Sequence, residues 1–123
     1  MNRLGDLQDT IVALATAPGV SAIGVIRLSG TDAVVIADKI FKGKDLLKQT
    51  SHTIHFGHIT SPPTPLQKRG EQDVIDEVVV SLFLGKKSYT GENTVEISGH
   101  GSPYILGKII EAAVAAGARW AKP

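Results

Sequence analysis

Apolar and polar residues alternate strictly over a short stretch late in the chain. In residues 94–98, Val95 and Ile97 take one side of an extended backbone, while Glu96 and its polar neighbours take the other. This period of two predicts a strand with one face on a core and one face open. The open face is therefore where a polar side chain such as Glu96 can meet a ligand.

A glycine-rich corner follows this strand. We expect Gly99, His100 and Gly101 to turn the backbone tightly before a helix that Ser102 caps and Pro103 starts. Such a corner would leave free N–H groups pointing outward, which makes it a candidate seat for a ligand. A lone loop histidine such as His100 is more often a local hydrogen-bonding residue than a catalyst.

Four other segments have the apolar content of strands. Residues 10–16 and 22–29 flank a turn signal at 17–20, so we expect them to form a hairpin. Residues 54–60 and 77–84 are two further strands, separated by a long polar and proline-rich loop. Together with the alternating stretch at 94–98, they predict a sheet.

Two segments repeat their apolar residues at helical spacing instead. The first follows Thr31 and ends near Gly43, and the second runs from Pro103 to Ala116 and ends at Gly117. Residues 118–122 suggest the start of a last strand. The order predicts an α+β fold, a mixed sheet of about five to six strands with two helices on one face.

Composition narrows the class of protein. The 123 residues are 42% hydrophobic and 20% charged, which is typical of a soluble globular domain, and we expect residues 1–123 to form one. The absence of cysteine excludes a disulfide framework, a thiol nucleophile and cysteine-ligated zinc. The start of the chain lacks the apolar run of a signal peptide, and no stretch could span a bilayer, so we expect a cytoplasmic protein without a membrane partner.

Two apparent motifs, a metal site and a phosphate loop, are not supported by the positions of their residues. His52, His55 and His58 cannot converge on one metal ion, because His55 faces the opposite side of a strand from the other two. The run 85–88, Gly-Lys-Lys-Ser, resembles a phosphate loop, but the motif needs a glycine separated from Gly85 by four residues, and that position is Val80. The formal charge of +1, with scattered lysines, also shows no basic stripe for nucleic acid.

Two charged residues interrupt predicted strands. Arg27 lies in the apolar run of residues 23–30, and Glu96 lies in the alternating stretch. One interpretation is a cross-strand ion pair, or two charges on a solvated face. The other is a binding site, because a carboxylate can accept two parallel N–H bonds from an amino-pyrimidinone edge, as in a pterin or guanine, and a guanidinium suits a carbonyl or carboxylate.

Three ordered segments carry a family resemblance. They are DTIVALATAPGVSAIGVIRLSG at 9–30, SYTGENTVEISGHGSPYI at 88–105 and GARWAKP at 117–123. Together they resemble the N-terminal domain of the bacterial and organellar tRNA modification GTPase family called MnmE or TrmE. The resemblance implies a fold like the tetrahydrofolate-binding module of the glycine-cleavage T-protein.

The resemblance also implies a function. Such a domain mediates homodimerisation and binds 5-formyl-tetrahydrofolate or a related reduced folate, and the family motifs place folate contacts on Arg27 and Glu96. In the family, a helical domain with an inserted GTPase domain follows, and GTP, magnesium and potassium bind only there. With the flavin-dependent partner MnmG (GidA), the full protein modifies the wobble uridine of certain tRNAs, so tRNA is an indirect partner.

Several family features lie outside this sequence. A Gly-Glu-Phe-Thr-like run and a further folate-contacting lysine are missing, as are the phosphate loop, the switch machinery and a reactive C-terminal cysteine. We therefore expect an N-terminal fragment of a longer protein that carries part of the folate site, without GTP hydrolysis or carbon transfer of its own. The rival hypotheses are a purely structural dimerisation module and a one-carbon transferase of the T-protein kind.

Overall fold

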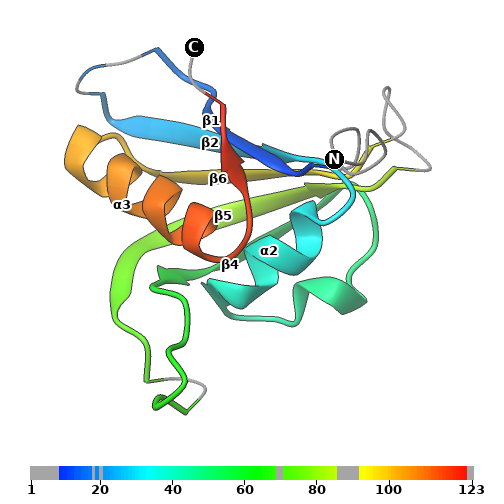
Figure 1. Cartoon of the computed structure of the whole chain (residues 1–123). Helices are drawn as coiled ribbons and strands as arrows, with labels where there is room; N and C mark the ends of the chain where they lie inside the picture. The colour runs from blue at the N-terminus through cyan, green and yellow to red at the C-terminus, as the bar shows by residue number, and fades with distance from the viewer. Residues whose placement is uncertain (1–8, 18, 20, 69–70, 86–91, 122–123) are drawn as a thin grey trace.

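A computed structural model describes residues 9–17, 19, 21–68, 71–85 and 92–121. Seven strands and two α-helices make up the described part of the chain (Figure 1). The strands are β1 (Ile11–Leu14), β2 (Ile23–Ser29), β3 (Phe41–Lys42), β4 (Thr53–Thr60), β5 (Val74–Phe83), β6 (Thr94–His100) and β7 (Arg119–Trp120). The helices are α2 (Ala33–Lys39) and α3 (Pro103–Ala115), and a short 3₁₀ turn, η1 (Leu46–Lys48), follows β3.

All seven strands join one mixed sheet in the order β3-β4-β5-β6-β2-β1-β7. Strands β1 and β2 form the expected antiparallel hairpin, and β4 and β5 form a second one. The pairing of β7 with β1 is parallel, which makes the sheet mixed. The α+β prediction is confirmed, and the sheet has one strand more than the expected five to six.

Both helices pack on the same face of the sheet (Figure 1). Alternate residues of the central strands point toward them and are fully buried, as the period of two predicts. The largest of these buried side chains are Val12, Ile26, Leu28, Ile59, Val78, Val80, Leu82, Val95 and Ile97, which meet Ile40, Leu46 and Ile109 from outside the strands. The opposite face has no helix over it in Figure 1, so its side chains decide what the sheet can bind.

Two local expectations are corrected. Phe41 and Lys42 leave the first helix and pair with β4 as β3, because Phe41 is buried against the core instead of completing a helical turn. The segment after β3 contains η1, and the side chain of Asp45 before it accepts a hydrogen bond from the Leu47 N–H. Strand β6 continues through His100, so the chain does not turn at Gly99.

The boundaries of α3 agree well with the sequence. Ser102 caps α3, since its hydroxyl accepts a bond from the Ile105 N–H at 3.4 Å, and Pro103 stands at the start of the helix. Gly117 follows the helix with a φ of 125°, a left-handed conformation that favours glycine. No helix in the described ranges is long and apolar enough to cross a membrane.

Candidate functional site

The uncovered face of the sheet has a polar centre. Strand registers align Ala13, Arg27, Glu96, Ser81 and Ile54 in one row across β1, β2, β6, β5 and β4. Arg27 and Glu96 are direct cross-strand partners on the two central strands of this row. The structure therefore brings together the two charges that the sequence singled out, although they are 69 residues apart in the chain.

The Arg27 guanidinium bonds one oxygen of the Glu96 carboxylate. Its Nη2 donates to Oε2 at 2.8 Å and its Nε donates to the same atom at 3.1 Å. The side chains are 49% and 28% exposed, so solvent reaches both groups. An exposed pair of this kind contributes about 1 kcal/mol or less to stability. Stability alone is therefore a weak reason for two charges at the centre of the sheet.

This geometry is the cross-strand ion pair that the sequence suggested as one interpretation. It does not exclude the other interpretation, a ligand-binding site. Among the described residues, both hydrogen bonds to the Glu96 carboxylate end on Oε2, and Oε1 has no protein donor. Each carboxylate oxygen has two acceptor positions, and Arg27 uses both of those on Oε2, so Oε1 is the oxygen left open to a ligand. Two parallel N–H bonds from an amino-pyrimidinone edge, one to each oxygen, require Arg27 to give up one of its bonds to Oε2.

Apolar side chains lie at one end of this row and beside it on the open face. Ile54 and Phe56 of β4 are 70% and 67% exposed, and Ile23 of β2 is 62% exposed. Val79 lies beside Phe56 in the strand register and is half-buried. Large apolar side chains gathered on one uncovered face are a feature of surfaces that bind a partner or a ligand.

The glycine-rich corner differs from the expected anion seat. The His100 N–H donates to Asp76 Oδ2 at 2.8 Å, and the Gly101 N–H donates to the Ala22 carbonyl oxygen at 3.3 Å. These amides are used within the fold, so they do not point outward to a ligand. Gly101 is required for close approach, because a Cβ at this position would overlap the backbone oxygen of Ser21.

Sequence reasoning missed Asp76 altogether. Its carboxylate is buried, and its second oxygen, Oδ1, lies 2.6 Å from Nδ1 of His100. Strand β5 contains two adjacent acids, Asp76 and Glu77, and the available signal was that Asp76 falls on the side where Val78 and Val80 are buried. A charged residue at such a position requires a polar partner, but the sequence does not say which one.

The three clustered histidines do not assemble. His55 is buried on the helix side, His58 lies on the open face 3.8 Å from Glu77, and His52 precedes β4 with a φ of 62°. Among the described residues, no group of three metal-binding side chains comes together. The rejected phosphate loop involves Lys86–Ser88, which lie outside the described residues.

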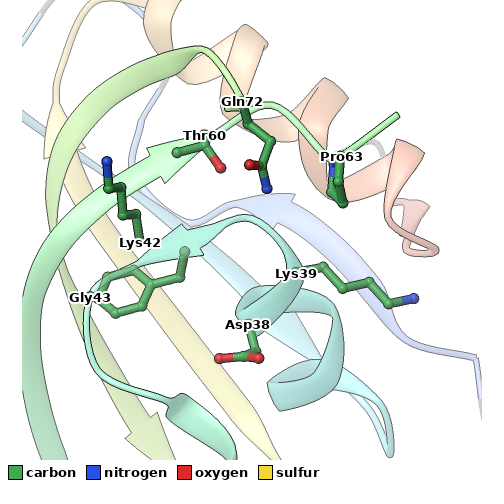
Figure 2. A pocket seen from close by; sticks show the side chains of 8 residues that line it. Asp38, Lys39, Lys42, Gly43, Thr60, Pro63 and Gln72 are labelled. Carbon is green, nitrogen blue, oxygen red and sulfur yellow. The ribbon is translucent and has the colours of Figure 1, made fainter. Parts of the chain in front are cut away.

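A separate hollow of about 350 Å³ lies on the helix side of the sheet (Figure 2). Two of its charged side chains already bond the protein. Lys39 donates to the carbonyl oxygen of Ala116 at 3.3 Å, and Asp38 accepts from the Leu46 N–H at 3.0 Å. Their role in joining α2 to its surroundings accounts for these charges, and the hollow is remote from Arg27 and Glu96.

The fold and its open face define a class of protein, an α+β domain whose one-sided sheet carries a paired cation and carboxylate. Residues 10–123 match the family described as GTP-binding protein TrmE N-terminus. The chain therefore belongs to this family, as its three sequence segments predicted.

Two similar proteins are both named tRNA modification GTPase MnmE. The protein of Flavobacterium psychrophilum is 50% identical over 118 residues, which are 94% of this chain and 24% of that protein. The protein of Streptococcus pyogenes serotype M1 is 47% identical over 115 residues, again 94% of this chain and 24% of that protein. The chain thus spans about a quarter of the length of these curated relatives.

Proposed function

We propose that this domain binds a reduced folate of the 5-formyl-tetrahydrofolate type and holds two copies of its parent protein together. The observation that carries the proposal is the solvent-exposed Arg27–Glu96 pair at the centre of the uncovered sheet face. For the full-length parent protein we propose the function that the name of its relatives states, that of a GTPase in tRNA modification. GTP, with magnesium and potassium, would bind outside these 123 residues, and MnmG and tRNA would meet the whole protein in the cytoplasm.

The ligand assignment rests on the chemistry of Glu96. Its carboxylate is partly open to solvent, and it can accept two parallel N–H bonds from the amino-pyrimidinone ring of a folate once Arg27 gives up one of its two bonds to Oε2. The Arg27 guanidinium keeps the carboxylate in place and offers further donors to a ring carbonyl. Bonds from neutral donors to an ionised group are each worth about 1.5–3 kcal/mol.

Replacing Glu96 with glutamine tests this assignment. Glu96→Gln keeps the size of the side chain but removes one acceptor and the charge, so we expect binding of 5-formyl-tetrahydrofolate to weaken by about ten- to hundredfold in a calorimetric titration. The matched control is Glu111→Gln, an exposed acid on α3 on the helix side of the sheet, which should leave the affinity unchanged. Equal affinities for wild type and Glu96→Gln would exclude Glu96 as the ring-binding residue.

The dimer assignment rests on the apolar part of the open face. A sheet face with Ile54 and Phe56 more than half exposed needs a cover, and a second copy of the chain supplies an apolar surface of the same kind. We therefore expect Ile54→Asp to raise the dimer dissociation constant by at least about tenfold in sedimentation velocity experiments.

The matched control for the dimer is Leu47→Asp. Leu47 is also an exposed apolar residue, at 55%, but it lies in η1 beside α2 and away from the open face. This variant should sediment as the wild type does. If Leu47→Asp dissociates the dimer and Ile54→Asp does not, the subunits meet through the helix side of the sheet instead.

The ion-pair geometry itself favours a second candidate, a purely structural dimerisation module. In that case Arg27 and Glu96 only tie β2 to β6, and the protein forms a folded dimer that is indifferent to folate. Sedimentation with and without 5-formyl-tetrahydrofolate separates the two candidates. A T-protein-like transferase ranks below both, and consumption of folate with an amine donor would reveal it.

A further inference from the structure

The pairing of Asp76 with His100 has no part in the site proposed above. The carboxylate is only 9% exposed, and its two oxygens contact the backbone N–H and the ring Nδ1 of the same histidine, at 2.8 and 2.6 Å. It lies over Gly99, where an added Cβ would come within 2.5 Å of Oδ2. Because Gly99 has no side chain, the buried carboxylate of Asp76 has room to reach His100.

This contact sets the orientation of the imidazole ring. A carboxylate accepts hydrogen bonds, so Nδ1 of His100 carries the proton that joins it to Asp76. In the neutral ring the other nitrogen, Nε2, is then an acceptor. The histidine side chain is 70% exposed, so Nε2 is accessible while the ring is held by a side chain that is itself buried.

His100 borders a shallow hollow of about 230 Å³ on the open face. Ile23, Phe56 and Val79 give it apolar walls, and Ser98 contributes a hydroxyl. Glu77 stands on its rim beside His58 and would repel a carboxylate of a ligand. The hollow therefore suits a flat apolar group that carries an N–H donor.

The hollow and Glu96 lie along one strand. Glu96, Ser98 and His100 alternate on the same side of β6, and four residues of strand separate the first from the last by about 13 Å. One elongated ligand could touch both ends. A reduced folate has this form, because an aryl-amide arm with N–H groups extends from its pyrimidinone-containing ring.

We propose that the hollow receives the aryl-amide arm of the folate whose ring Glu96 binds, and that His100 accepts a hydrogen bond from an N–H of the arm through Nε2. The inference rests on the proposed function, since it requires the ring at Glu96. The phenyl ring packs against Phe56 and Val79, while the terminal carboxylates stay in water outside the hollow, because Glu77 on the rim repels them. Asp76 acts as a positioning residue that holds the imidazole for this bond.

The test compares two ligands that differ only in the distal part. Calorimetric titrations would use 5-formyl-tetrahydrofolate and 6-methyl-tetrahydropterin, a reduced pterin that lacks the arm. We expect His100→Ala to weaken folate binding about tenfold and to leave pterin binding unchanged. His58→Ala, which removes an exposed histidine of the same face, should change neither affinity.

The outcomes separate this inference from the proposed function. If wild type binds neither ligand, the folate proposal fails. If folate binds and depends on Glu96, but His100→Ala binds it as wild type does or weakens both ligands equally, only the role of His100 fails. Where pterin binding is too weak to measure, the ¹⁵N resonance of His100 Nε2 decides: it should shift when folate is added, and an unchanged resonance would overturn the contact.

Discussion

At the scale of single residues, His55 shows how a polar group can be buried without a charge. Its Nε2 lies 2.8 Å from the Thr53 hydroxyl oxygen, and that hydroxyl donates its own proton to the Thr50 carbonyl oxygen at 2.7 Å. The His55 ring therefore donates to Thr53 from Nε2. Burial lowers the pKa of His55 from its usual value of 6.5, and the nearby charge of Lys44 lowers it further.

The lowered pKa predicts a pH dependence of stability. Below pH 6.5 the unfolded chain takes up a proton at His55, whereas the folded protein takes it up only at a lower pH. The contribution of neutral His55 to stability is therefore complete above pH 6.5 and is lost as the pH falls through the pKa of the folded state. We expect His55→Gln, which can still donate to Thr53, to lose less stability than wild type between about pH 7.5 and about pH 5. Urea unfolding of both proteins at the two values measures this, and equal losses would contradict it.

At the scale of elements, close contacts between strands and helices depend on small residues at a few positions. Gly101, just after β6, lies close to the segment that precedes β2. Its carbonyl oxygen accepts a hydrogen bond from the Ser21 N–H, and its own N–H donates to the Ala22 carbonyl oxygen. On α3, by contrast, Gly107 has open space where a Cβ would stand. The two glycines therefore predict opposite effects of the same substitution.

Alanine at these two positions tests the contrast. Gly101→Ala should lower the free energy of unfolding by about 1–3 kcal/mol, because the methyl group overlaps the Ser21 backbone and separates the two segments. Gly107→Ala should raise it by about 0.5–1 kcal/mol, because alanine is the better helix former. Thermal unfolding of the two variants beside wild type is sufficient, and a neutral Gly101→Ala would mean that this end of β6 is loosely packed.

The same elements show what local pattern can and cannot predict. Alternation around Val95, the hairpin signal before Ala22 and the capping pair Ser102 and Pro103 depend on near neighbours, and all three are confirmed. Strand β3 was missed because Phe41 fits the helical spacing as well as it fits a strand, and only β4 decides between them. The Asp76–His100 contact joins residues 24 apart, so no local pattern could have paired them.

At the scale of the whole molecule, one edge of the sheet is completed by the end of the chain. The Arg119 N–H donates to the Thr10 carbonyl oxygen at 2.8 Å, and the Ala121 N–H donates to that of Val12 at 2.9 Å. The Arg119 side chain also reaches Asp9, with Nε and Oδ2 3.1 Å apart. Strand β7 thus covers the outer edge of β1 with backbone hydrogen bonds.

A chain that ends at Ala118 tests this edge. Losing the two backbone bonds should lower the free energy of unfolding by about 2 kcal/mol. Arg119→Ala in the complete chain keeps those bonds and removes only an exposed ion pair, so it should cost less than about 1 kcal/mol. Urea titrations distinguish the backbone contribution from that of the side chain, and equal losses in the two proteins would assign the effect to Arg119 alone.

The strand order also has a consequence for synthesis on the ribosome. The hairpin β1–β2 emerges first, yet its neighbours in the sheet are β6 and β7, and contacts such as Arg27 with Glu96 and Asp9 with Arg119 span 69 and 110 residues. Long-range pairing of this kind makes folding slow. We therefore expect the edge of β2 to stay unpaired until β6 has left the exit tunnel, and the edge of β1 until Trp120 has left it, which makes this hairpin the segment of the growing chain most in need of a chaperone.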